Sequence, residues 1–296
     1  MAHAQFVTVQ IPPAAPGSKP SDAEIDLFGL SHPGKVRKEN QDHFLLCTMH
    51  RQLVVHATSL PDPDRMSVRS ERLATLGMVA DGVGGSAAGA EASRIAVETV
   101  AKYVTCTINC FDTHDPDLEV EFVNAMRDAA LEAHKTVLAR GSEAKELEGL
   151  ATTLTLAIAA WPRLYILQVG DSRCYYHHDD ELTLVTRDQT VAQDLIDRGV
   201  LRHSSAETSP FRHVLASALG GGEAMPVVST LILKRGNAVL LCSDGLTKHV
   251  SDDEITSHLA RIETSEQACR ALVDLALERG GSDNITVLIG RSKKEN

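Results

Sequence analysis

Four aspartates of this sequence stand at the edges of apolar runs, and each is next to a glycine or an amide residue. In chain order they are Asp42, Asp81, Asp244 and Asp283. Asp81 and Asp244 are each followed by glycine, and an aspartate followed by glycine at the end of a strand is most often a turn. Taken alone, each of the four therefore has a purely structural explanation.

The four carboxylates together favour a metal centre. Like charges that converge on one site repel each other unless a cation holds them. Ligation by oxygen alone, without His or Cys, selects a hard octahedral ion, hence magnesium or manganese rather than zinc or copper. Two such ions about 4 Å apart can share a water molecule and lower its pKa until it is a nucleophile near neutral pH. The expected chemistry is the hydrolysis of a phosphate ester.

Arg37 lies five residues before Asp42, so a bend between them could bring its guanidinium beside the carboxylates. The planar fork of an arginine matches two phosphate oxygens, which a lysine cannot contact in the same bidentate way. The alternative is an exposed surface arginine, because Lys35 and Lys38 are its near neighbours in the sequence.

The net charge of the chain limits the kinds of molecule that it is expected to bind. The formal net charge is −11 and the pI is about 5.6, which argues against a surface for nucleic acid or anionic lipid. A metal-dependent nuclease with similar carboxylates is disfavoured for the same reason. No apolar run approaches the roughly 20 residues that span a bilayer, and no basic segment followed by an apolar one opens the chain. We expect a cytoplasmic protein that does not bind membranes.

Hydrophobic periodicity predicts runs of strands interrupted by pairs of helices. Predicted strands cover residues 24–30, 43–47, 76–80, 151–159, 163–169, 173–177, 182–185, 238–242 and 285–289. Predicted helices cover residues 86–97, 120–140, 191–199 and 266–278. Because strands and helices do not alternate strictly, the order favours antiparallel sheets with helices packed outside over a doubly wound parallel sheet.

Three regions are expected along the chain. Residues 1–22 contain four prolines among Ala, Gly and Ser, a composition that predicts a disordered tail. Residues 23–292 are expected to form one catalytic domain. Within it, residues 188–225 are polar and mixed, and we expect them to form a semi-independent flap.

Six motifs in order resemble the bacterial form of the metal-dependent serine/threonine protein phosphatases of type 2C, over about residues 24–291. They are Arg37-Lys38-Glu39-Asn40-Gln41-Asp42, Asp81-Gly82-Val83-Gly84-Gly85, Ala151-Thr152-Thr153, Gly170-Asp171-Ser172-Arg173, Ser243-Asp244-Gly245-Leu246 and Ser282-Asp283-Asn284. The resemblance implies an α+β fold, a four-layer αββα sandwich in which two antiparallel sheets are flanked by pairs of helices. It also implies two Mn²⁺ or Mg²⁺ ions at the edges of the sheets.

The resemblance also implies a role for each site residue. Asp81 would bridge both ions and the carbonyl of Gly82 would bind one of them. Asp244 and Asp283 would complete the other ion, and Asp42 would act directly or through water. Arg37 would hold the substrate phosphate, while a bridging water attacks phosphorus in line without a phosphoenzyme.

The sequence departs from the family at three positions. Val83 stands where some relatives have a histidine that is proposed to protonate the leaving group, so a bound water or another group must do this. Ser86 replaces a histidine of many bacterial members. Gly149 matches an aspartate that helps a third metal in relatives, which leaves the adjacent Glu148 as the candidate ligand for a third ion. Asp171 is interpreted as a structural hydrogen-bonding residue.

The predicted function is a phosphoprotein phosphatase, a phosphoric monoester hydrolase that acts on phosphoserine and phosphothreonine. Its partners would be phosphorylated proteins, in opposition to a serine/threonine kinase, and the protein is expected to be a monomer. The alternative is a catalytically weak module of the same fold that senses phosphoproteins. All four metal aspartates and Arg37 are present, which disfavours that alternative.

Overall fold

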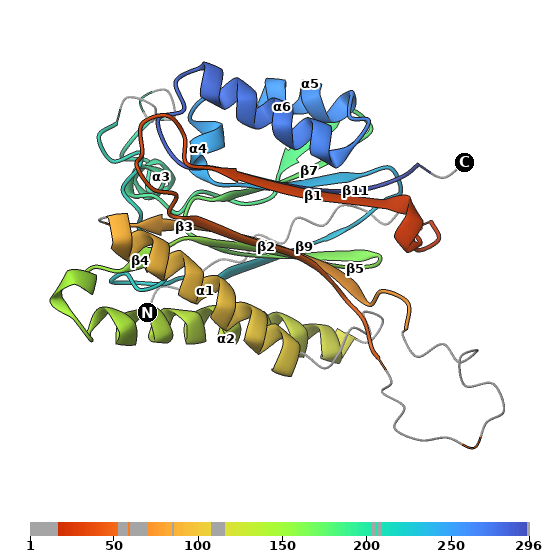
Figure 1. Cartoon of the computed structure of the whole chain (residues 1–296), viewed down its shortest axis with the longest axis horizontal. Coiled ribbons are helices and arrows are strands. Elements are labelled where there is room, and N and C mark those ends of the chain that lie inside the picture. The colour runs from red at the N-terminus through yellow and green to blue at the C-terminus, as the bar shows by residue number, and fades with distance from the viewer. Residues whose placement is uncertain are drawn as a thin grey trace.

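Two stacked β-sheets with helices on both outer faces make up the protein (Figure 1). The computed structural model describes residues 17–52, 59, 70–84, 86–107, 116–202, 205 and 209–294. All pairings between named strands are antiparallel. The predicted four-layer architecture is therefore confirmed.

In the described residues each sheet follows one path of neighbouring strands. The first has the order β1 (Ile25–His32), β11 (Ile285–Ser292), β10 (Ala238–Cys242), β7 (Arg173–His178) and β8 (Glu181–Leu184). The second has the order β2 (Asp42–Met49), β3 (Ala74–Val83), β5 (Leu154–Ala160), β6 (Arg163–Val169) and β9 (Val227–Ile232), and β4 (Ala151–Thr152) pairs with β3.

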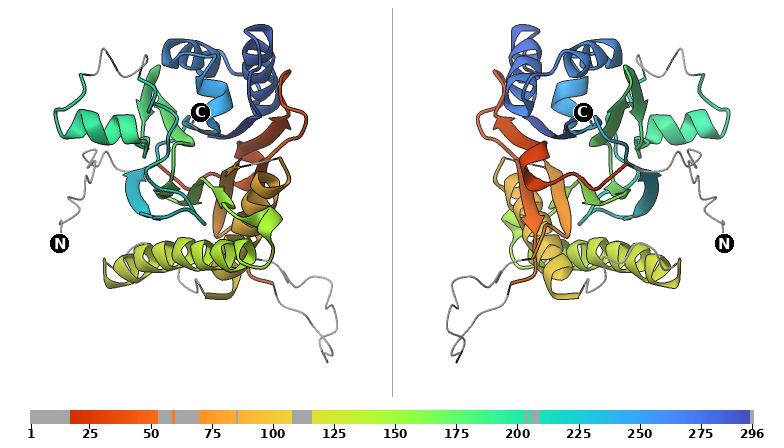
Figure 2. Two further views of the ribbon diagram at one scale, coloured as in Figure 1. Left: turned by 90° about the vertical axis from the view of Figure 1, so that its left-hand side faces the viewer. Right: turned by 90° about the vertical axis from the view of Figure 1, so that its right-hand side faces the viewer.

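Each sheet is covered on its outer face by helices, as the two end views in Figure 2 show. The long helices α1 (Ser86–Thr107) and α2 (Pro116–Gly141) lie on the second sheet. The first sheet carries α4 (Asp244–Thr247), α5 (Asp252–Ala260) and α6 (Ser265–Glu278). Helix α3 (Val191–Asp197) lies at the side, and 3-10 turns occupy η1 (Asp22–Glu24) and η3 (Lys145–Leu147).

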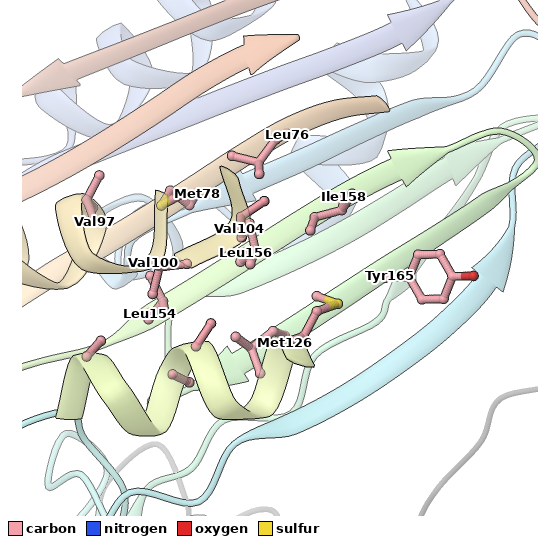
Figure 3. Close-up of a cluster of buried hydrophobic side chains, with 14 of the residues drawn as sticks. Leu76, Met78, Val97, Val100, Val104, Met126, Leu154, Leu156, Ile158 and Tyr165 are labelled. Carbon is pink, nitrogen blue, oxygen red and sulfur yellow. The ribbon is translucent and has the colours of Figure 1, made fainter. Parts of the chain in front are cut away.

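Alternation along β3 explains how one strand serves two cores. Leu76 and Met78 point toward α1 and α2, where they pack with Val100, Met126 and Leu156 (Figure 3). Val79 belongs instead to the layer between the two sheets. Side chains of a strand alternate between its faces, so a strand that is apolar on both faces must be covered on both. Residues 76–80 read as one continuous apolar run for this reason.

Strand β9 and helix α5 are among the elements that lie outside the predicted set. Strand β9 is rich in β-branched residues, a composition typical of strands, and it pairs with β6. Helix α5 begins with a capping box in which Ser251 and Glu254 hydrogen-bond reciprocally. That spacing, Ser-x-x-Glu, is a signal for a helix start, so both elements were readable from the sequence.

The segment before β1 packs on the end of the sandwich away from the metal-binding candidates. Trp161 Nε1 donates a hydrogen bond to the carbonyl of Gly17 at 3.2 Å, and Arg72 donates to the carbonyl of Pro20 at 2.8 Å. The predicted tail of residues 1–22 thus includes residues that contact the domain, while residues 1–16 lie outside the described residues. The boundaries of the domain and of the flap stay predictions. No helix in the described part of the chain has the length and hydropathy to cross a membrane.

Candidate metal centre

Two of the predicted ligands sit opposite each other on neighbouring strands of the second sheet. Asp42 opens β2 and Asp81 lies near the end of β3, and their Cα atoms are partners in the antiparallel register. Directly opposed residues of an antiparallel pair have their side chains on the same face. Pairing of the two strands is therefore enough to bring these carboxylates together.

The other two predicted ligands come from the first sheet. Asp244 follows β10 as the first residue of α4, and Asp283 lies two residues before β11 begins. Strands β10 and β11 are neighbours and antiparallel, so the end of one lies beside the start of the other. The four carboxylates thus come from two sheets, which meet at this end of the sandwich.

Asp42 is fixed by two neutral donors. The hydroxyls of Ser243 and Thr286 each donate to its Oδ2 atom at 2.7 Å, and its Oδ1 atom is buried without a hydrogen-bond partner. Burial, helped by the nearby charges of Asp244 and Asp283, raises the pKa of Asp42 to about 6. The hydroxyls come from the first sheet, so they also tie β2 to it.

Asp81 is fixed through its backbone by two of the sequence motifs. Its N–H donates to Thr153 Oγ1 at 3.0 Å, and its carbonyl accepts from Thr152 Oγ1 at 2.8 Å. Thr153 Oγ1 in turn lies 2.8 Å from Ser172 Oγ. Burial, followed by the charges of Asp42 and Asp244, raises the pKa of Asp81 well above its usual value. The motifs at 151–153 and 170–173 thus position this carboxylate.

Glycine follows Asp81 and Asp244 for a steric reason that holds at both places. A Cβ on Gly82 would lie 2.1 Å from the carbonyl oxygen of Gly89 in α1, and a Cβ on Gly245 would lie 1.9 Å from the carbonyl oxygen of Asn284. Both contacts are with backbone, which cannot move aside as a side chain can. The carbonyl of Gly82 also lies close to Gly89, and its role as a metal ligand stays a prediction.

Two cations contact the carboxylates of the first sheet. Arg37 holds Asp283 with both prongs of its fork, from Nε to Oδ1 at 2.8 Å and from Nη2 to Oδ2 at 3.0 Å. Lys248 Nζ lies 2.7 Å from Asp244 Oδ2 and 2.8 Å from Asp283 Oδ2. Burial acts to raise the pKa of Asp283, but these hydrogen bonds from Arg37 and Lys248 lower it overall.

The buried amide of Asn284 holds the loop that carries Arg37. Its Oδ1 atom accepts from the N–H of Gln41 at 2.8 Å, and its Nδ2 atom donates to the carbonyls of Pro33 and Glu39, both at 2.9 Å. A side-chain amide with three such bonds on one loop restricts the path of that loop. Asn284 therefore sets where the guanidinium of Arg37 can reach.

A cleft of about 740 Å³ opens beside the cluster, between α3 and α4, and Asp171, Arg173, His213, Asp244 and Lys248 are among its lining residues. Asp171 is 8% exposed, and burial together with the charges of Asp244 and Asp188 raises its pKa to about 8. With this raised pKa, the carboxyl group of Asp171 is largely protonated at neutral pH. His213 Nδ1 lies 4.0 Å from Asp244 Oδ2. His203 lies outside the described residues.

Glu148 and Val83 lie at the rim of this end. Glu148 is exposed at the end of η3, and Val83 is 41% exposed at the end of β3. Gly149, next to Glu148, adopts a φ of 82°, a conformation that favours glycine. Its carbonyl oxygen comes within 3.7 Å of a Cβ placed on Gly84. The assignment of Glu148 to a third metal stays a prediction.

The donor set fits a hard divalent cation. Two carboxylate oxygens in the described part of the chain, Asp42 Oδ1 and Asp244 Oδ1, are buried and accept no hydrogen bond, which costs free energy unless a cation or donor meets them. The described residues contain no group of three His, Cys, Asp or Glu side chains already closed around a metal position. Asp244 and Asp283 turn one oxygen each to Lys248 instead. Binding an ion through these two oxygens therefore requires them to exchange partners.

Comparison with known proteins identifies the family. A sequence profile of the family Protein phosphatase 2C matches residues 56–276. The chain belongs to the protein phosphatase 2C family. The sandwich of two antiparallel sheets described above is thus the fold of a phosphatase 2C domain.

Relatives of this phosphatase 2C domain include two bacterial proteins. The chain is 38% identical to the serine/threonine protein phosphatase PstP of Mycobacterium tuberculosis over 71% of its own length, and it spans only 39% of the length of PstP. It is 31% identical to the serine/threonine phosphatase stp of Listeria monocytogenes, covering 72% of this chain and 82% of that protein.

The fold is shared with solved structures of phosphatase 2C proteins. A crystal structure of the catalytic domain of PstP in complex with two manganese ions aligns with a TM-score of 0.67 and 31% identity, covering 91% of this chain and 99% of that one.

Several residues that hold the site together had no role assigned from the sequence. Among them are Ser243, Lys248, Asn284 and Thr286. Ser243 and Asn284 lie inside motifs that the sequence analysis identified, but the sequence did not predict their hydrogen-bond partners. Lys248 follows Asp244 by one helical turn, a spacing that places two residues on the same face and could have been noticed.

Proposed function

We propose that this protein is a metal-dependent protein serine/threonine phosphatase that uses two Mn²⁺ or Mg²⁺ ions. The observation that carries the proposal is the convergence of Asp42 and Asp81 from one sheet with Asp244 and Asp283 from the other. Family membership and the two manganese ions of the PstP catalytic domain support it.

The carboxylates of Asp42, Asp81, Asp244 and Asp283 and the carbonyl of Gly82 are the proposed ligands. Bound divalent ions supply a Lewis acid that lowers the pKa of a water and neutralises phosphate oxygens. Ser243 and Thr286 orient Asp42 so that its Oδ1 atom stays available. Hydrogen bonds from Thr152 and Thr153 hold the backbone of Asp81.

Arg37 is the proposed phosphate-binding residue. It comes from the loop fixed by Asn284 and is half-exposed beside the cluster, with a side-chain exposure of 49%. Its fork contacts Asp283, so binding of a phosphate requires the guanidinium to turn from this carboxylate toward the substrate.

The substrate class is tested with matched phosphopeptides. Phosphate release is measured from phosphoserine, phosphothreonine and phosphotyrosine versions of one peptide in the presence of Mn²⁺. The proposal predicts release from the first two. Release from the phosphotyrosine peptide alone would refute the assignment. Binding of the phosphothreonine peptide without release would instead establish the alternative, a phosphoprotein-sensing module that opposes no kinase by catalysis.

A further inference from the structure

Lys248 brings a positive charge between two proposed metal ligands. It caps α4 in helical conformation, one turn after Asp244. Its Nζ atom lies 2.7 Å from Asp244 Oδ2 and 2.8 Å from Asp283 Oδ2. The ammonium thus joins the end of β10 to the start of β11, at the place where a shared cation would bind.

The surroundings of Lys248 make this contact strong. The exposed fraction is 21% for the Lys248 side chain, 17% for Asp244 and 18% for Asp283. Charges with so little access to water interact more strongly than charges at a surface. With two carboxylate oxygens at 2.7 and 2.8 Å, the amine of Lys248 is a charged ammonium at neutral pH.

One ammonium and one divalent ion cannot use the same oxygens. A lysine donates up to three hydrogen bonds, and here two of them end on the Oδ2 atoms of Asp244 and Asp283. The two cations also repel each other at such short range. The cleft that Lys248 lines has a volume of about 740 Å³, so its ammonium has space to leave the carboxylates.

We propose that Lys248 is a built-in cation that competes with divalent ions for Asp244 and Asp283 and thereby sets the metal affinity of this site. This inference rests on the proposed metal centre. Lys248 acts as a positioning residue, since it holds the two carboxylates side by side until an ion takes its place. Its removal therefore strengthens metal binding and weakens the protein without metal.

Calorimetric titration with Mn²⁺ tests the competition directly. Lys248→Met removes the ammonium and adds no ligand oxygen, and we expect its dissociation constant for Mn²⁺ to fall about tenfold or more. Lys248→Arg keeps the charge and is expected to stay near the wild type. Lys38→Met removes the same charge from an exposed lysine next to Arg37, and we expect less than about a twofold change because exposed charges are screened.

Thermal unfolding gives a second, independent measure. In EDTA, Lys248→Met is expected to unfold about 4 °C below the wild type, because two partly buried carboxylates lose the cation that they share. The stabilisation gained from saturating Mn²⁺ should be larger in this variant than in the wild type. A purely structural lysine would lower both midpoints equally.

The outcomes separate the two proposals. If the wild type binds no Mn²⁺, the metal centre itself is refuted. If the wild type binds Mn²⁺ and Lys248→Met binds it with equal or weaker affinity, the competition is refuted while the metal centre stands. Tighter binding by Lys248→Met, together with a larger gain in stability, establishes both.

Discussion

The carboxylates of the site fall into two classes according to their neighbours. Asp283 is held by Arg37 and Lys248, which lower its pKa. Asp42 is buried and Asp81 is half-buried, both are held by neutral groups, and their pKa values are raised. A raised pKa means that a proton occupies the carboxylate at pH values where an exposed aspartate is already charged. Protons and metal ions therefore compete for Asp42 and Asp81.

The affinity for Mn²⁺ is predicted to rise with pH through about pH 6, the pKa of Asp42, and to keep rising above it as Asp81 loses its proton.

The free energy of unfolding in EDTA is predicted to change with pH in the opposite direction. The folded state binds more protons than the unfolded state between the usual aspartate pKa of 3.8 and the raised value of about 6, so stability falls as pH rises through this window. Calorimetric titrations with Mn²⁺ across about pH 5 to pH 8, and unfolding curves in EDTA across about pH 4 to pH 7, measure the two effects. Metal affinity that is flat across the range would contradict the proton competition.

Arg37→Ala is predicted to raise the KM for a phosphothreonine peptide about tenfold or more, since a bidentate contact between arginine and phosphate is strong. Metal binding should stay intact, because Arg37 is not a ligand. Steady-state kinetics and calorimetric titration with Mn²⁺ measure the two effects separately. Arg37→Lys, which keeps the charge but not the fork, should recover only part of the loss. Unchanged kinetics in Arg37→Ala would remove its assigned role.

At the scale of elements, each of the two Asp-Gly turns places a carboxylate at the end of a strand. The glycine of each turn also lets the backbone of another segment pack closely against it. The backbone of Gly89 in helix α1 lies against Gly82, and the backbone of Asn284, just before β11, lies against Gly245. These contacts set how closely α1 and β11 approach the cluster. The glycines thus have a packing role besides any role in metal binding.

Gly82→Ala and Gly245→Ala are each predicted to lower the free energy of unfolding by more than about 2 kcal/mol, because the added methyl meets backbone oxygen. Gly222→Ala is the matched control, since nothing lies within 4 Å of a Cβ at that position, and it should be neutral or slightly stabilising. Urea denaturation measures all three variants. Equal stability of Gly82→Ala and Gly222→Ala would mean that α1 can shift freely.

The sequence was most informative where local pattern and structure coincide. Apolar runs predicted β3, β5, β6, β10 and β11, because strands covered on both faces must be apolar throughout. The strand-end aspartates followed from those runs. Strand β9 and helix α5 were missed although their composition and capping box were legible. No local pattern could predict hydrogen bonds between residues that are far apart in the sequence. Examples are the bond from Thr286 to Asp42 and the bond from Asn284 to the loop that carries Arg37. Those partners are 244 and 245 residues away from the groups they hold.

On the scale of the whole molecule, the site lies where two sheets with separate helical layers meet. Asp42 and Asp81 belong to the sheet covered by α1 and α2, and Asp244 and Asp283 adjoin strands of the sheet covered by α5 and α6. Between the sheets lies a third apolar cluster that includes Val79, Ile166 and Leu241. A cation shared by the four carboxylates would join the two halves at one end of that cluster.

Saturating Mn²⁺ is predicted to raise the midpoint of thermal unfolding of the wild type by about 5 °C or more, because a ligand that binds only the folded state stabilises it. Asp81→Asn removes the carboxylate proposed to contact both ions, and most of this gain should be lost. Scanning calorimetry with and without EDTA provides the measurement. An equal shift in both proteins would place the bound manganese elsewhere.

The most direct test of the central claim is the initial rate of phosphate release from a phosphothreonine peptide, measured against Mn²⁺ concentration for the wild type and for Asp81→Asn. We predict turnover that requires Mn²⁺, stops in EDTA and falls by about 100-fold or more in Asp81→Asn, while the circular dichroism of the variant stays that of the wild type. Turnover that persists in EDTA, or an unchanged rate in Asp81→Asn, would contradict the assignment of this site as the metal centre of a phosphatase.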